Sequence, residues 1–197
     1  MMSYLSLIPN PPKICLLTGG IAPMLSPPLE VYKSLFQRVK ERNFLYYEMY
    51  PGDIQLIHTI VAALLENPVP LPSGGILTAR RFLQVGIALG GSPSSFASLH
   101  CFFNSAILDQ TDGKVIFSKA FLKQMDSIQP FDDHPIYFLL HESIYADGQK
   151  FGGTNWAAYR AFEEIRTTMD EFRYEVTSKQ KSNEHPTMLL GEMVRVL

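Results

Sequence analysis

Hydrophobic residues recur with the period of an α-helix along most of this chain. From Leu29 onward, apolar positions fall on one side and polar positions on the other, which predicts an amphipathic helix of about five turns over 29–47. Pro51 suits the first turn of a second helix, which Asn67-Pro68 ends. The predicted apolar faces are Leu29, Tyr32, Phe36, Val39, Asn43, Tyr46 and Tyr47 in the first helix, and Ile54, Ile57, Ile60, Val61, Leu64 and Leu65 in the second.

Shorter helical patterns follow, separated by polar or proline-rich segments. Thr78 is a suitable N-cap for a helix over 79–89, which the Gly90-Gly91 pair ends. Three prolines and a Gly-Gly pair in 68–75 predict a loop before that helix. Further helices are predicted over 94–108, 118–125, 134–145 and 154–174, with a polar turn over 109–114 and a solvated loop over 177–185.

The run from Ile14 to Leu17 has a different pattern. It is short, continuously apolar and closed by Thr18 and two glycines, which is typical of a fully buried parallel strand. Such a strand needs neighbours for its backbone donors and acceptors, and no other convincing strand is found in the sequence. We therefore expect a mainly helical chain with one residual strand of a sheet that the sequence does not complete.

Composition excludes several classes of protein. Hydrophobic residues make up 46% and charged residues 18% of the 197 residues, which is enough apolar material for a globular core. The net charge is −2 and the basic residues are scattered, so we do not expect a nucleic-acid partner. No apolar run is long enough for a membrane span, and the N-terminus lacks the basic start of a signal peptide. We expect a cytoplasmic protein without a membrane partner.

Four segments in order carry a resemblance to one enzyme family. They are 1–20 with the motif LTGG-x-x-P, 31–53 with RVKERN and YYEMYPGD, 139–156 with LLHESIY, and 190–194 with GEMV. Their order and spacing resemble the prolyl aminopeptidases, also called proline iminopeptidases, a serine peptidase family of the α/β-hydrolase superfamily. The resemblance covers the chain nearly from end to end.

This resemblance implies a fold class and a domain division. The chain is expected to be mainly α, the helical cap or lid of an α/β-hydrolase with one residual core strand. Residues 1–28 would be a remnant of the hydrolase core, 29–190 the cap, and 191–197 a return toward the core. The implied parent enzyme is a serine aminopeptidase that releases N-terminal proline from peptides.

The catalytic residues of that family have no counterpart here. The sequence contains no G-x-S-x-G, the nucleophile elbow of α/β-hydrolases, and the family's triad Asp and His would follow residue 197. We expect the chain to supply substrate recognition and to have no peptidase activity by itself. A truncated gene model, a pseudogene product or an unusual splice form would each explain such a sequence.

Glu142 is the principal candidate for substrate binding. It interrupts an otherwise apolar helical segment, and a buried carboxylate without a partner is costly. In the prolyl aminopeptidases, a glutamate at the matching place in the cap binds the α-amino group of the substrate. The alternative is a structural ion pair with an arginine such as Arg80 or Arg81.

Three further residues are candidates for the same pocket. Glu192, in the GEMV segment, is a second acidic residue for the substrate ammonium, although a Gly-Glu pair is also common in simple turns. Tyr145 and Trp156 are aromatic residues near Glu142 that would wall a proline-sized pocket, the alternative being ordinary packing. No cofactor is expected, because His141-Glu142 lacks the second histidine of the H-E-x-x-H zinc motif.

A function from another class stays open. A helical domain that presents the surface meant for a hydrolase core would expose a large apolar area. The chain would then be a noncatalytic module that binds a protein partner, or it would self-associate through that surface. For the same reason we expect marginal stability.

Overall fold

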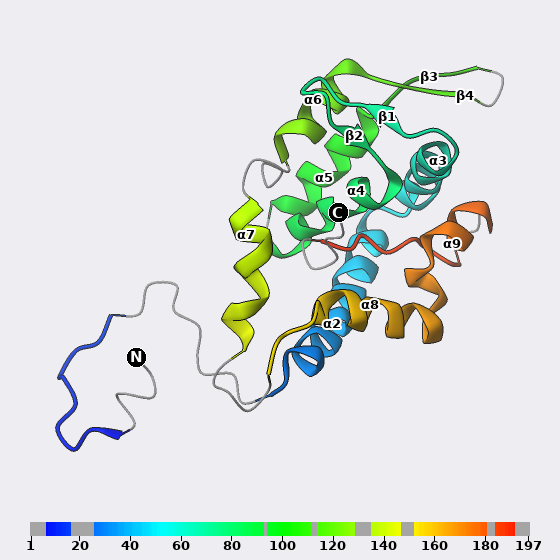
Figure 1. Cartoon of the computed structure of the whole chain (residues 1–197). Helices are drawn as coiled ribbons and strands as arrows, with labels where there is room; N and C mark the ends of the chain where they lie inside the picture. The colour runs from blue at the N-terminus through cyan, green and yellow to red at the C-terminus, as the bar shows by residue number, and fades with distance from the viewer. Residues whose placement is uncertain are drawn as a thin grey trace.

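The computed structural model describes residues 7–16, 26–92, 94–111, 114–128, 135–146, 152–180 and 184–191 (Figure 1). Helices dominate it, as the sequence predicts. The α-helices are α2 (Pro28–Met49), α3 (Gly52–Glu66), α4 (Ala79–Leu83), α5 (Ser95–Asn104), α6 (Lys119–Ile128), α7 (Pro135–Leu140), α8 (Ala157–Thr168) and α9 (Tyr174–Gln180). Short 3-10 helices are η1 (Gln84–Gly90), η3 (His141–Tyr145) and η5 (Asp170–Phe172), and the strands are β1 (Val69–Pro70), β2 (Ile76–Leu77), β3 (Ile107–Thr111) and β4 (Lys114–Phe117).

The first two long helices form where the hydrophobic period predicts them. In α2, Pro28 stands in the first turn, where its missing N–H costs nothing, and Glu30 complements the positive end of the helix dipole. Most residues of the predicted apolar faces are buried in both helices; Leu29 and Val39 in α2 are partly buried, and Leu65 at the end of α3 is exposed. Helix α3 also buries two polar residues on its apolar face, Asp53 and His58.

The predicted helix over 79–89 forms in two parts. Thr78 caps it as expected, because its hydroxyl accepts the backbone N–H of Arg81 at 3.1 Å. After Leu83 the chain tightens into the 3-10 helix η1, which ends at Gly90. The preceding loop is closed by a short antiparallel pairing of β1 with β2, which the sequence did not indicate.

The prediction that a helix extends over 94–108 is wrong at its end. Helix α5 stops at Asn104, and β3 then pairs with β4 in an antiparallel hairpin that projects from the helices (Figure 1). The sequence feature that could have indicated this hairpin is the Asp112-Gly113 dipeptide, which lies outside the described residues. An Asp-Gly pair flanked by residues that favour strands is the strongest short-range sign of a hairpin.

The prediction of one helix over 154–174 is also wrong. Helix α8 ends at Thr168 because Met169 adopts an extended conformation, with φ −128° and ψ 103°. The hydroxyls of Thr167 and Thr168 bond carbonyls three residues earlier, at 2.6 and 3.1 Å, where the helix stops. Helix α9 then reaches Gln180, within the segment predicted as a solvated loop.

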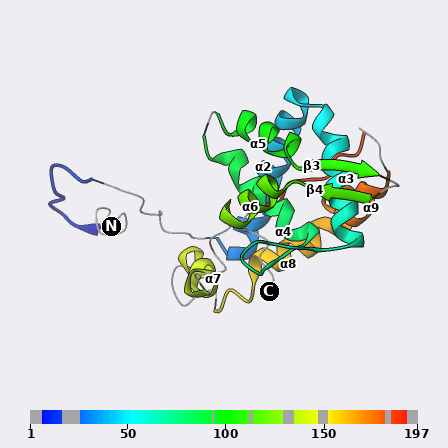
Figure 2. The same cartoon turned by 90° about the horizontal axis from the view of Figure 1, so that it is seen from above.

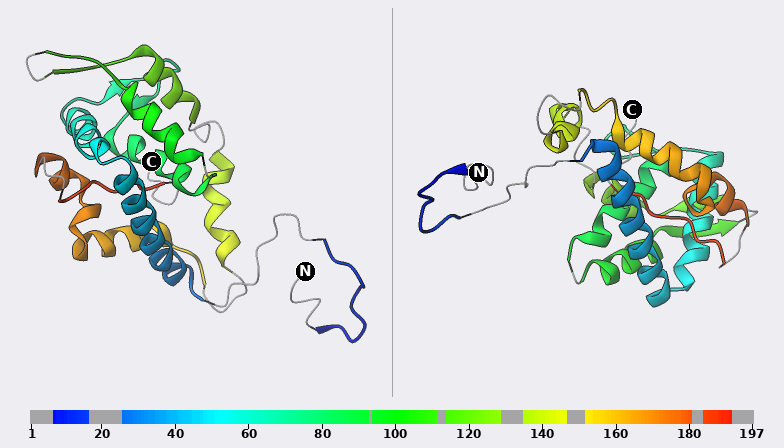
Figure 3. Two further views of the ribbon diagram at one scale, coloured as in Figure 1. Left: turned by 180° about the vertical axis from the view of Figure 1, so that it is seen from behind. Right: turned by 90° about the horizontal axis from the view of Figure 1, so that it is seen from below.

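The predicted strand over 14–17 is not formed in its described part. Residues 14–16 have no regular structure, and Ile14 and Leu16 are 79% and 80% exposed; Leu17 lies outside the described residues. The segment 7–16 lies apart from the helices (Figures 1 to 3). The physical reason is that no described strand lies beside it to satisfy its backbone.

A single hydrophobic cluster holds the helices together. It extends from Tyr32 in α2 to Leu190 near the end of the chain. Helix α2 packs along α8, and α3 packs against α9 (Figure 3). Aromatic rings fill the centre, among them Phe36 and Phe172, whose ring centroids lie 5.7 Å apart in an edge-to-face arrangement.

Two other findings concern the surface of the described residues. Cys15 and Cys101 are exposed and form no disulfide with each other. Among the described helices, none combines the length and the apolar character needed to cross a membrane.

Candidate functional site

The start of helix α8 has an unusual backbone. Asn155 and Trp156 both adopt the left-handed conformation, with φ of 49° and 52°. Residues other than glycine rarely do so, and such strained positions are concentrated at functional sites. The guanidinium of Arg160 holds this turn, because it donates to the carbonyls of Asn155 and Thr154 at 3.0 and 3.2 Å.

Glu142 caps helix α8 from a distance in the sequence. Trp156 occupies the N-cap position, and an indole has no oxygen with which to accept the first N–H groups of the helix. The Glu142 carboxylate takes that role: it accepts the N–H of Ala157 at 2.9 Å and that of Ala158 at 2.8 Å. A negative charge at this end of the helix is also favoured by the helix dipole.

The alternative prediction for Glu142, an ion pair with Arg80 or Arg81, is not what the described contacts show. Arg80 lies over the rings of Tyr159 and Phe162, 5.5 and 5.6 Å from their centroids. Arg81 extends elsewhere, toward Gly75. The buried carboxylate of Glu142 is instead satisfied by backbone amides.

The structure brings two of the four predicted site residues to one place. Glu142, in η3, contacts the first turn of the helix that Trp156 opens, and the Trp156 side chain is 47% exposed. Tyr145 ends the same 3-10 helix, but its side chain is not described. Glu192 follows the last described residue, Gly191, and lies outside the described residues.

The Glu142 carboxylate retains chemical capacity. A carboxylate offers about four lone-pair positions, and two of them are occupied by Ala157 and Ala158. The capping bonds fix the orientation of the group before any ligand arrives. A fixed carboxylate at a helix N-terminus, with lone pairs that no described residue is seen to occupy, is suited to accept hydrogen bonds from a compact cation.

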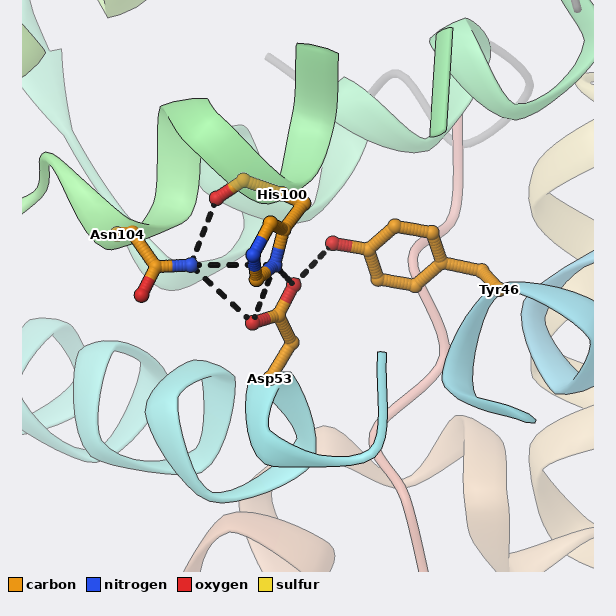
Figure 4. A network of polar contacts seen from close by, with 4 residues as sticks. All are labelled: Tyr46, Asp53, His100 and Asn104. Atoms are coloured by element: carbon orange, nitrogen blue, oxygen red, sulfur yellow. Dashed lines mark hydrogen bonds and ion pairs between the residues drawn. The ribbon is translucent and has the colours of Figure 1, made fainter. Parts of the chain in front are cut away.

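A second polar cluster was not predicted from the sequence. Asp53, in the first turn of α3, is buried, and three side chains from α2 and α5 surround its carboxylate (Figure 4). Tyr46 donates its hydroxyl to Asp53, and the Nδ1 of His100 lies 3.0 Å from the same carboxylate oxygen. Asn104 donates to the other oxygen at 3.4 Å. The sequence feature that could have revealed this cluster is Asp53 itself, an acidic residue four positions before Ile57 on an otherwise apolar helix face.

This cluster, which we call the Asp53 network (Tyr46, Asp53, His100 and Asn104), joins three helices. Burial, together with the Asp53 carboxylate, raises the pKa of the Tyr46 hydroxyl well above its usual range, so that Tyr46 stays a donor. The ring of Tyr50 stacks on His100 with centroids 4.2 Å apart. We assign the network a structural role, the connection of α5 to the turn between α2 and α3.

Metal-binding residues do not gather in the described ranges: nowhere in them do three or more His, Cys, Asp or Glu side chains form a group that would hold a metal ion.

Sequence comparison identifies relatives of this chain. It is 33% identical over 159 residues to the proline iminopeptidase of Aeromonas sobria, a match that covers 81% of this chain and 35% of the relative. It is 34% identical over 160 residues to the proline iminopeptidase aneH of Aspergillus aculeatus, covering 80% of this chain and 34% of that protein. The chain thus spans about a third of the length of the curated relatives it matches. No known protein-family model matches it.

Proposed function

This chain resembles a stretch of the proline iminopeptidases over four fifths of its length, and from that premise we propose that it is the substrate-recognising cap of such an enzyme. The parent activity would be the release of N-terminal proline from peptides. Residues 1–28 would be a remnant of the hydrolase core, 29–190 the cap, and 191–197 the return toward the core. The single hydrophobic cluster from Tyr32 to Leu190 supports a cap of that extent.

The observation that carries this proposal is the position of Glu142. Its carboxylate is buried, oriented by two amides of α8, and placed beside the turn that bears Trp156. We propose that its remaining lone pairs accept the ammonium of a peptide's N-terminal proline. Charge-assisted hydrogen bonds of this kind are about twice as strong as neutral ones. Glu192 would be the second acidic contact, and Tyr145 and Trp156 would wall the ring of the proline.

Catalysis would require groups that this sequence does not contain. It has no G-x-S-x-G, so the attacking serine of the family reaction has no counterpart in these 197 residues. We propose that the isolated chain binds the free amino terminus and performs no acyl transfer. The proposal involves no cofactor, and a cytoplasmic location remains an expectation from the sequence.

The amides of Ala157 and Ala158 provide the test. Both N–H groups bond Glu142 directly, so a cation that binds this carboxylate should shift their resonances in a nitrogen–proton correlation spectrum. We expect titration with L-prolinamide to move these two signals in a saturable manner. Acetylation of the proline nitrogen removes the ammonium, so N-acetyl-L-prolinamide should leave them unmoved.

A matched control distinguishes the site from general electrostatics. Glu163, on the same helix, forms a partly exposed ion pair with Arg166 at 3.4 Å. We expect Glu163→Gln to keep the response to L-prolinamide and Glu142→Gln to abolish it. Equal responses to the free and acetylated amides, or a response that survives in Glu142→Gln, would contradict the proposal.

A second function is favoured by one observation. Helix α7 lies at the margin of the structure and exposes Ile136, Leu139 and Leu140 by 69%, 63% and 59% (Figure 2). Such an apolar face is suited to cover another protein surface, in a noncatalytic interaction module or in self-association. Sedimentation velocity of the chain and of Leu139→Glu tests this: concentration-dependent association lost in the variant would support it.

A further inference from the structure

The short segment before helix α8 is held in an unfavourable backbone conformation. Gly152 has a positive φ of 63°, which glycine adopts without strain, but Asn155 and Trp156 follow with φ of 49° and 52°. This conformation is costly for residues that carry a Cβ atom, and it persists only where surrounding contacts hold it. The turn formed by 154–156 therefore needs contacts that keep it in place.

Arg160 supplies those contacts from the first turn of α8. Its Nε donates to the carbonyl of Asn155 at 3.0 Å, and its Nη2 donates to the carbonyl of Thr154 at 3.2 Å. The backbone N–H of the same residue donates to the carbonyl of Trp156 at 3.1 Å. Arg160 is thus bonded to all three carbonyls of the turn, and its planar guanidinium fork is what spans two of them at once.

The direction of the Arg160 side chain supports a specific role. An arginine on a helix commonly pairs with an acidic residue three or four positions away, and Glu163 and Glu164 stand at those positions. Each of them has another partner: Glu163 pairs with Arg166 at 3.4 Å, and Glu164 pairs with Lys33 at 2.7 Å. Arg160 instead turns back toward the carbonyls that precede the helix.

The turn that Arg160 holds sets the position of two groups at once. It places the amides of Ala157 and Ala158 where the Glu142 carboxylate accepts both N–H groups, at 2.9 and 2.8 Å. It also fixes the backbone from which the ring of Trp156 extends, and Trp156 is 47% exposed. A relaxed turn would move the indole ring and the carboxylate relative to each other.

We infer that Arg160 is a positioning residue for substrate recognition, because its two side-chain bonds hold Trp156 in the left-handed conformation beside the Glu142 carboxylate. The inference rests on the proposed function, in which Glu142 accepts the ammonium and Trp156 walls the proline ring. Arg160 acts through the backbone of 154–156. A turn that is held before the ligand arrives does not have to be ordered on binding, so the affinity should depend on Arg160.

Two substitutions of Arg160 test this role. Arg160→Gln removes both the charge and the fork, and Arg160→Lys keeps the charge without the fork. Arg173→Gln is the matched control, because Arg173 is also exposed but its guanidinium bonds a side chain, that of Asp170, at 3.2 Å. The first readout is the fluorescence of Trp156, which is the single tryptophan of the chain and reports on this turn alone.

In Arg160→Gln we expect acrylamide to quench Trp156 more strongly, with a Stern–Volmer constant about 1.5-fold or more above wild type, because a released turn exposes more of the ring. Arg160→Lys should show the same increase and Arg173→Gln none. An unchanged or smaller constant in Arg160→Gln would overturn the inference. A wild-type value in Arg160→Lys, or an equal increase in Arg173→Gln, would also overturn it, since the fork would then not be the cause.

The second readout is the L-prolinamide titration followed at the amides of Ala157 and Ala158. We expect Arg160→Gln to raise the dissociation constant about 5-fold or more, because a turn that adopts the binding conformation only part of the time lowers the apparent affinity by that fraction. The shift at saturation should persist, since Glu142 is unchanged. A purely structural role would lower Tm and leave the dissociation constant of the folded chain at its wild-type value.

The two readouts separate this inference from the proposed function. Wild-type affinity in an Arg160→Gln chain whose Trp156 quenching has risen would overturn the positioning role and leave the proposed function standing. If the wild-type chain itself shows no response to L-prolinamide, the proposed function fails, and the role of Arg160 in recognition fails with it.

Discussion

Replacement of Glu142 by glutamine should destabilise the chain by an amount that can be worked out from its contacts. The carboxylate accepts two N–H groups of the first turn of α8, at 2.8 and 2.9 Å. Glutamine keeps one acceptor oxygen but turns its NH₂ group toward the other N–H. The variant therefore loses one hydrogen bond to a charged acceptor and the favourable charge at the helix N-terminus.

Each of these losses has a typical magnitude. A hydrogen bond to a charged group contributes about 1.5–3 kcal/mol, and a charge at a helix terminus about 0.3–1 kcal/mol. Since the remaining amide oxygen offsets part of the loss, we expect the free energy of unfolding to fall by about 2 kcal/mol. For a protein of this size, that lowers Tm by about 4–8 °C.

Urea and thermal unfolding followed by circular dichroism measure this change. Glu163→Gln removes a partly exposed ion pair at 3.4 Å on the same helix and leaves Arg166 its closer pair with Glu175 at 2.9 Å, so it should alter the free energy of unfolding by less than about 0.5 kcal/mol. An unchanged Tm in Glu142→Gln would refute the capping role. Because the cap makes Glu142 structural in any case, a lowered Tm does not by itself argue against substrate binding; only the comparison of free and blocked amines does.

Three other predictions follow from the structure. Gly86→Ala should destabilise the chain by about 2 kcal/mol or more, since the added Cβ would lie 2.6 Å from the carbonyl carbon of Leu189. A Cβ on Gly90 would have nothing within 4 Å, so Gly90→Ala should change the free energy of unfolding by less than about 1 kcal/mol. Chemical denaturation compares the two variants. Burial lowers the pKa of His58, so as the pH falls the unfolded chain binds the extra proton first. Stability should therefore be lost as the pH falls from about 6.5 toward the lower pKa of the folded state. The Tm of the wild type should fall more between pH 7 and 5 than that of His58→Gln, and equal decreases would contradict this. The purified chain should not hydrolyse a proline arylamide above buffer, because no nucleophile elbow is encoded; saturable turnover abolished by a serine-directed phosphonate would show otherwise.

Local patterns in the sequence were sufficient for the long helices. The faces of α2 and α3 follow from a period that depends only on neighbouring residues, and the Thr78 cap acts within its own turn. The hairpin after Asn104 was missed because the apolar run through Phe103 and Ala106 continues the helical pattern, although the helix has already ended. There the turn chemistry of Asp-Gly outweighs the period.

Contacts between distant residues were not predictable in this way. Glu142 was identified as needing a partner, but its partners are backbone amides at a helix start whose own N-cap residue, Trp156, has no acceptor. Asn43 was placed on the apolar face, and its pairing with Leu189 depends on a segment 146 residues away. The Asp53 network likewise joins side chains from three helices, which a one-dimensional pattern does not bring together.

Kinetics of a chimeric enzyme test the central claim most directly. The matching segment of the Aeromonas sobria proline iminopeptidase would be replaced by this chain, and kcat/KM measured for a proline arylamide and its N-acetylated form, with folding checked by Tm. We predict that the chimera cleaves the free-amine substrate and that Glu142→Gln lowers its kcat/KM by roughly 10- to 150-fold, the equivalent of about 1.5–3 kcal/mol, with little effect on the blocked substrate. Equal losses on both substrates, or no loss on either in a folded variant, would contradict the assignment of Glu142 to the substrate ammonium.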